Sequence, residues 1–151
     1  MILSLALGML AGTNVPPRAA TTERVVVDPH TGLAIYGVDP VGYFTDRKPV
    51  PGRPDVEYRH AGAIWRFANE GNRAAFAADP DVYMPRYGGY DPVGITRGVA
   101  TPGFPALWAL FEQRLYLFYA PDARAAFLAD PASVIASASA HWSAVRSELA
   151  D

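Results

Sequence analysis

An internal repeat runs through the middle of the chain. When the sequence is shifted by 51 positions, residues 51–80 match residues 102–131 at 11 of 30 positions. The identities include a Pro-Gly pair at the start, Arg-Ala-Ala-Phe in the middle and Asp-Pro at the end. One position out of this phase, Asp-Pro-Val-Gly at residues 39–42 recurs at residues 91–94. Because a repeat of this length corresponds to one recurring supersecondary unit, the sequence predicts two similar units.

Each copy has the pattern of a β-hairpin. In the first copy, Val56–His60 and Ala63–Phe67 are rich in branched and aromatic residues and are separated by a two-residue turn. In the second copy, Leu107–Phe111 and Arg114–Tyr119 lie at the same offset. Nearly every residue of the second hairpin is apolar, so we expect it to lie centrally, with both faces covered.

Capping residues and prolines place the helices. Asn69 is expected to cap a helix that ends near Ala78, since Pro80 disfavours helical geometry at the residue before it. Asp79 and Asp130 are each expected to cap a further helix that begins with proline. Helix breakers soon end the first of these, whereas the second continues as an amphipathic helix. The apolar positions of this closing helix are Val134, Ala138, Trp142, Val145 and Leu149.

These elements together predict an α+β fold: two pseudo-symmetric hairpin-helix units with antiparallel sheet and a C-terminal helix. We expect one compact domain over residues 23–151, with the first copy at about 37–87 and the second at about 88–145. A further short hairpin is expected upstream, around a turn in which Gly32 supplies a positive φ.

The first 22 residues are interpreted as a signal peptide or another N-terminal segment. Residues 1–12 form an uncharged apolar run that is shorter than the roughly 20 residues needed to span a bilayer. The run has the length of a signal-peptide core, but no basic residue precedes it, so a helix or strand docked on the core is the alternative. We expect an exported protein, periplasmic or extracellular, without an integral membrane span; a cytoplasmic location stays open.

Charge and cysteine content exclude several classes of function. Thirteen Lys and Arg against fifteen Asp and Glu give a net charge of -2, which argues against a nucleic-acid partner. The chain has no cysteine, so disulfides, thiolate zinc sites, iron–sulfur clusters and cysteine nucleophiles are excluded. The short signatures of hydrolases and nucleotide-binding enzymes do not occur in the sequence.

The order of the motifs resembles the YHS domain family. Asp-Pro-Val-Gly-Tyr-Phe at residues 39–44 is followed by a hairpin that ends in Trp-Arg-Phe at residues 65–67, and then by the helical segment 72–83. Tyr-Gly-Gly-Tyr at residues 87–90 is similar to an extension in a bacterial branch of that family, whose members are often regarded as exported. The resemblance runs from about residue 28 to the C-terminus.

Members of that family with cysteines look like small metal-binding modules, and the resemblance implies where their thiols align. The aligned positions are Gly42, Ala68 and Asn72 in the first copy and Gly94, Tyr119 and Ala123 in the second. A further cysteine of the bacterial branch aligns with Asp91. Because soft metals and structural zinc need several ionised sulfur ligands, the resemblance implies a scaffold whose thiol metal site is lost and which holds no cofactor.

We therefore interpret the chain as a non-enzymatic, extracytoplasmic binding or interaction module, whose partner is an unknown protein or small ligand. Two glycines between tyrosines at residues 87–90 favour rings that line a pocket or a partner surface, and a purely structural turn is the alternative. The candidate ligand-binding residues are Tyr43, Trp65, Tyr87, Tyr90 and Asp91.

Two other classes of function stay open. A hard or borderline metal ion, or a small ligand held by Asp, His and Tyr side chains, would use Asp28, His30 and a carboxylate such as Asp39. An enzyme would need Asp39 and Asp91 to meet as an acid/base pair. Asp-Pro-Val-Gly more simply predicts that each aspartate accepts backbone N–H bonds in an Asx turn.

Overall fold

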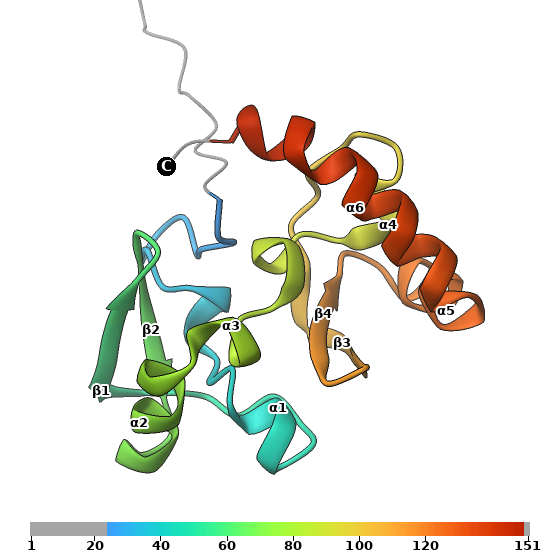
Figure 1. Cartoon of the computed structure of the whole chain (residues 1–151). Coiled ribbons are helices and arrows are strands. Elements are labelled where there is room, and N and C mark those ends of the chain that lie inside the picture. Colours follow the sequence, from blue (N-terminus) through green and yellow to red (C-terminus); the bar gives the residue numbers. More distant parts are fainter. Residues whose placement is uncertain (1–23, 150–151) are drawn as a thin grey trace, which may run out of the picture.

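The computed structural model describes residues 24–149 (Figure 1). The expected signal segment at residues 1–22 lies outside the described residues. Among the described helices, none is both long enough and apolar enough to cross a membrane. Over the same part of the chain the fold is α+β, as predicted, with two antiparallel sheets of two strands each and six helices, the last of them C-terminal.

Each unit consists of a hairpin and the helices that follow it. The elements of the first unit are β1 (Arg53–His60), β2 (Ala63–Phe67), α2 (Glu70–Ala78) and α3 (Pro80–Tyr83). Those of the second are β3 (Phe104–Phe111), β4 (Arg114–Phe118), α5 (Pro121–Ala129) and α6 (Pro131–Ser147). Each element of the second unit begins 51 residues after its counterpart, so the structural offset equals the sequence offset. The predicted pair of hairpin-helix units is confirmed.

Shorter elements precede both hairpins in matching order. They are the 3-10 turns η1 (Ile35–Gly37) and η2 (Arg86–Gly89) and the short helices α1 (Gly42–Thr45) and α4 (Pro92–Ile95). Tyr36 in η1 and Tyr87 in η2 both have left-handed backbone, with φ of 58° and 56°. The two units therefore share a left-handed backbone conformation at equivalent tyrosines, a conformation that is uncommon for residues other than glycine.

The two hairpins have the same register. Tyr58 pairs with Trp65 in the first sheet, and Ala109 pairs with Tyr116 in the second. Both central turn residues have positive φ in each hairpin, as a type I′ turn requires. Such a turn matches the right-handed twist of the strands. The second hairpin keeps this turn type at residues 112–113 although it has no glycine there, where the first hairpin has Ala-Gly at residues 61–62.

The three capping predictions have different outcomes. The Asn69 side chain accepts a hydrogen bond from the Asn72 N–H at 2.8 Å, and the Asp130 side chain accepts one from Ser133 at 3.2 Å, as predicted. The prediction for Asp79 is wrong, because its side chain makes no cap bond. Its backbone carbonyl accepts the Val82 N–H at 3.3 Å instead, which satisfies the first turn of a helix only four residues long.

The upstream hairpin is shorter than the sequence predicts. Gly32 has the expected positive φ of 70°, but only Val27 and Ala34 pair across the turn. Tertiary pairing prevents a longer hairpin, since the Ala34 N–H donates to the carbonyl of Ile64 in β2 at 2.9 Å. Beyond it the chain turns into η1, where a strand was expected.

Two hydrophobic cores share the second hairpin. Leu115 and Leu117 of β4 belong to the core of the first unit, together with Trp65 and Phe76. The alternating residues Tyr116 and Phe118 belong to the core of the second unit, together with residues of α5 and α6. The predicted covered position is confirmed for β4, in which four of five residues are buried, whereas β3 is partly exposed, with Phe104 42% exposed. Figure 1 shows α6 over the second unit, far from β1 and β2.

Tyr43 connects the two units. Its side chain is fully buried, its hydroxyl donates a hydrogen bond to the Pro105 carbonyl of β3 at 2.9 Å, and its ring contacts Trp108 edge to face at 5.2 Å. Burial raises the pKa of Tyr43 above its ordinary value of 10.0. The stability that comes from keeping this phenol neutral is therefore fully present below about pH 10 and is lost as the pH rises further.

We expect Tyr43→Phe to lower the free energy of unfolding by about 1 kcal/mol at pH 7, because the Pro105 carbonyl loses its donor. The variant should also lose less stability than the wild type above pH 10, since phenylalanine cannot ionise. Denaturant unfolding at pH 7 and pH 10.5 measures both effects. Tyr58→Phe, which alters a half-buried tyrosine on the outer strand β1, is the control. An unchanged alkaline stability loss in Tyr43→Phe would contradict this assignment.

Candidate functional site

Most of the aromatic residues proposed from sequence lie in the cores. Tyr43 and Trp65 are 0% exposed and Tyr90 is 2% exposed. The Trp65 indole donates a hydrogen bond to the carbonyl of His60 at 3.0 Å, and the Tyr90 ring packs on Trp142. Tyr87 is also largely buried, but it is the member of this group that lines a cleft between the two units. The ligand-binding role of all four remains a prediction.

Asp39 and Asp91 serve as hydrogen-bond acceptors in their own units. Both are buried, and each accepts a bond at 2.8 Å from the backbone N–H two residues later, at Val41 and Val93. The Asx turns predicted for the two Asp-Pro-Val-Gly segments are therefore confirmed. The second oxygen of Asp91 accepts the Tyr119 N–H at 3.0 Å. All these donors belong to the unit of the aspartate itself, so these hydrogen bonds do not link the two units.

Most of the positions that align with the family's thiols lie at these carboxylates. In the first unit, the Ala68 N–H and the Asn72 side-chain amide both donate to Asp39 Oδ2, at 2.8 and 2.7 Å. In the second, a hollow of about 330 Å³ lies beside Asp91. Gly94, Tyr119 and Ala123 are among the residues that line it. Each carboxylate thus lies where the repeat brings its aligned positions together.

The three residues of the alternative metal site do not form one group of ligands. His30 Nδ1 lies 3.5 Å from Asp28 Oδ1 at an exposed turn, and the carboxylate of Asp28 accepts the His30 backbone N–H at 2.8 Å. This N–H bond is the main cause of a lowered pKa at Asp28. The carboxylate of Asp39 instead accepts hydrogen bonds from Val41, Ala68 and Asn72. Between residues 24 and 149, no three His, Asp or Glu side chains are grouped as a metal ion requires.

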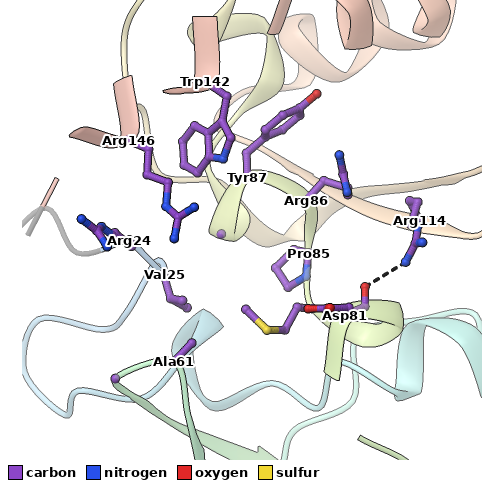
Figure 2. Close-up of a pocket in the computed structure, with 13 residues that line it drawn as sticks. Arg24, Val25, Ala61, Asp81, Pro85, Arg86, Tyr87, Arg114, Trp142 and Arg146 are labelled. Carbon is purple, nitrogen blue, oxygen red and sulfur yellow. Dashed lines mark hydrogen bonds between the residues drawn. The ribbon is translucent and has the colours of Figure 1, made fainter. Parts of the chain in front are cut away.

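A cleft lies where the two units meet (Figure 2). Its volume is about 720 Å³, within the range of roughly 300–1,000 Å³ usual for small-molecule sites. We call it the inter-unit cleft. It is bounded by the segment before η1, the β1–β2 turn, α3, η2, the start of β4 and the end of α6. The charged residues that line it are Arg24, Asp81, Arg86, Arg114 and Arg146.

Positive charge dominates the inter-unit cleft. Of the described residues that line it, four are arginines and one, Asp81, is acidic. No described carboxylate lies within 4.0 Å of the guanidinium groups of Arg86, Arg114 or Arg146. Arginine stays protonated at every physiological pH, so these charges persist. An acidic chain of net charge -2 therefore presents a cationic recess.

Aromatic rings form one wall of the cleft. The Trp142 indole is half-buried and meets the Tyr87 ring at 5.6 Å, edge to face. The Tyr87 hydroxyl lies 3.0 Å from the hydroxyl of Ser139 in α6, which fixes the ring. The Arg86 guanidinium lies 5.7 Å from the centre of the same ring. Figure 2 shows the indole and phenol together above the cleft, with Val25 and Ala61 on the facing side.

Two of the arginines stand where the first unit has buried apolar residues. At the repeat offset of 51, Arg86 corresponds to Ile35 and Arg114 to Ala63, which are 0% and 3% exposed. The sequence analysis did not identify any of the cleft arginines or Trp142 as site residues. Comparing the two copies for gained charge, as well as for identity, would have drawn attention to Arg86 and Arg114.

Comparison with known proteins supplies no relative. No family model, no curated protein and no solved structure matches the chain. The chemistry of a ligand is therefore inferred from the cleft itself.

Proposed function

We propose that the chain is a non-enzymatic binding module that holds an organic anion in the inter-unit cleft. The observation that carries this proposal is the concentration of arginines around an aromatic wall, three of them without an acidic partner among the described residues. An anion in the cleft would offset the mutual repulsion of these charges. Guanidinium groups bind carboxylate, phosphate and sulfonate oxygens through paired N–H bonds, and Trp142 offers a face to a ring or an alkyl chain.

The binding role is favoured over catalysis by how the buried carboxylates are used. Asp39 accepts three hydrogen bonds and Asp91 two, which accounts for both oxygens of each. A general base must reach a proton of the substrate, and these oxygens instead hold the turns that begin α1 and α4. The cleft offers guanidinium groups, which bind anions but do not accept protons at neutral pH.

We also propose that both units descend from a YHS-type module without thiols. This part is supported by the convergence of the aligned positions on Asp39 in the first unit and on Asp91 in the second. In each unit, the aspartate and the N–H groups that donate to it would then stabilise the fold in place of the lost metal site.

The proposed function is tested by calorimetric titration with 2-naphthoate, an aromatic anion, and with neutral 2-naphthamide as the control. We expect 2-naphthoate to bind with a Kd below about 1 mM and the amide to bind at least about tenfold more weakly. Affinity should fall as the salt concentration rises, because the arginines are partly exposed. Arg86→Gln should weaken binding, whereas Arg59→Gln, the same change at an exposed residue of β1, should not.

Equal affinity for the amide and the anion would contradict the proposal. So would equal effects of Arg86→Gln and Arg59→Gln. Neither variant alters a buried residue, and their melting temperatures are expected to agree with that of the wild type.

A further inference from the structure

The arginines of the inter-unit cleft lie at two ends. In Figure 2, Arg24 and Arg146 are on one side, and Arg86 and Arg114 are on the opposite side. Arg146 belongs to the last turn of α6, whereas Arg114 is the first residue of β4. The two ends are thus supplied by separate elements of the second unit.

The end at Arg86 and Arg114 is oriented before any ligand binds. The Arg114 guanidinium donates through Nη1 to the backbone carbonyl of Asp81 at 2.8 Å, which leaves its other N–H groups available. The Arg86 guanidinium lies 5.7 Å from the centre of the Tyr87 ring, on the aromatic wall. Fixed donors of this kind lose less entropy on binding.

Apolar surface separates the two ends. Trp142 and Tyr87 lie between them on one wall, and Val25 and Ala61 lie on the other (Figure 2). The volume of about 720 Å³ is far larger than one carboxylate or phosphate group. A ligand that fills the cleft therefore passes along apolar walls and reaches guanidinium groups at both of its ends.

We infer that the ligand is an elongated dianion, with one anionic group at each end of an apolar or aromatic middle. This inference rests on the proposed function and specifies the ligand of the same site. One anionic group binds at Arg86 and Arg114, and the other binds at the end that Arg146 provides. The middle packs against Trp142 and Tyr87.

The test compares dianions with monoanions of the same length by calorimetric titration of the full chain. The probes are 2,6-naphthalenedicarboxylate against 2-naphthoate, and straight-chain dicarboxylates of four to ten carbons against monocarboxylates of equal length. We expect the dianion of best-fitting length to bind at least about tenfold more tightly than its monoanion, since each end adds charge-assisted hydrogen bonds.

Variants assign the two ends. Arg146→Gln and Arg114→Gln should each lower the preference for the dianion at least about threefold, because one of its groups then loses a guanidinium that donates charge-assisted hydrogen bonds to it. Arg146→Lys and Arg114→Lys should keep part of the preference, since a charge remains without the paired N–H geometry. Arg59→Gln should keep the full preference. Melting temperatures of all variants establish that the fold is intact.

The outcomes separate this inference from the proposed function. If 2-naphthoate binds and no dianion binds more tightly than its monoanion, the two-ended ligand is wrong and the anion site stands. If the dianion preference survives both Arg146→Gln and Arg114→Gln, the assignment of its ends is wrong. If none of the anions binds, both proposals fail.

Discussion

Asp39→Ala is expected to lower the free energy of unfolding by about 3 to 5 kcal/mol. The carboxylate is 0% exposed and accepts three hydrogen bonds, from the N–H groups of Val41 and Ala68 and from the side chain of Asn72. Removing it leaves three donors without their charged acceptor at the junction of α1, β2 and α2. Each hydrogen bond to a charged group contributes about 1.5–3 kcal/mol, and relaxation and entering water recover part of the sum. Urea unfolding followed by circular dichroism measures the change.

The repeat supplies a matched comparison for this prediction. Asp91 occupies the equivalent place but accepts two bonds, because Ala123 stands where the first unit has Asn72. Asp91→Ala should therefore cost less, about 2 to 3 kcal/mol. Asp122→Ala, at an exposed aspartate, should stay close to the wild type. If Asp91→Ala proves the more damaging of the two, the number of bonds does not control the stability of these turns.

Gly103→Ala is expected to destabilise the fold by about 3 kcal/mol, through overpacking. A Cβ at this buried position would lie 2.6 Å from Leu117 Cβ, 2.7 Å from the carbonyl oxygen of Gly89 and 2.8 Å from the Leu117 carbonyl carbon. Two of these atoms belong to the backbone and cannot rotate away. The Gly103 N–H also donates to the Gly89 carbonyl at 3.0 Å, so movement of the strand breaks this bond.

Gly98→Ala is the control for Gly103→Ala. Gly98 has a φ of 74°, which disfavours alanine, but nothing lies within 4 Å of its added Cβ. Its cost should be about 1 kcal/mol, from backbone strain alone. Thermal and urea unfolding of both variants compare the two effects. A Gly103→Ala variant as stable as Gly98→Ala would show that the close approach of residue 103, just before β3, to η2 and β4 is readily relaxed.

Much of the fold could be predicted because the repeat carries local signals twice. The hairpins, the Asn69 and Asp130 caps and the closing helix depend on residues close together in the sequence. Predictions failed where distant contacts decide the conformation. Leu33 and Ala34 pair with Ile64 in β2, and the next residues, where the strand was expected to continue, form a 3-10 turn. Local propensity cannot report this competition.

The cleft could not be predicted, because its charges come from separate parts of the sequence. Arg24, Arg86, Arg114 and Arg146 form no local pattern, and the fold alone brings them to one recess. The aromatic residues misled the sequence analysis for a related reason. An aromatic ring is equally suited to a core and to a pocket, and only its exposure in the fold distinguishes the two uses. Tyr87 alone among the five candidates lines the inter-unit cleft.

The alternating side chains of β4 have a consequence for how the protein melts. Leu115 and Leu117 belong to the hydrophobic core of the first unit, and Tyr116 and Phe118 belong to that of the second. The strand therefore contributes to both cores. If the second unit unfolds, the hydrophobic core of the first loses the residues of β4 that belong to it, and if the first unfolds, these residues lose the core that covers them. Heating should therefore give one cooperative transition. The two units, although similar in sequence and in structure, are therefore expected to unfold together.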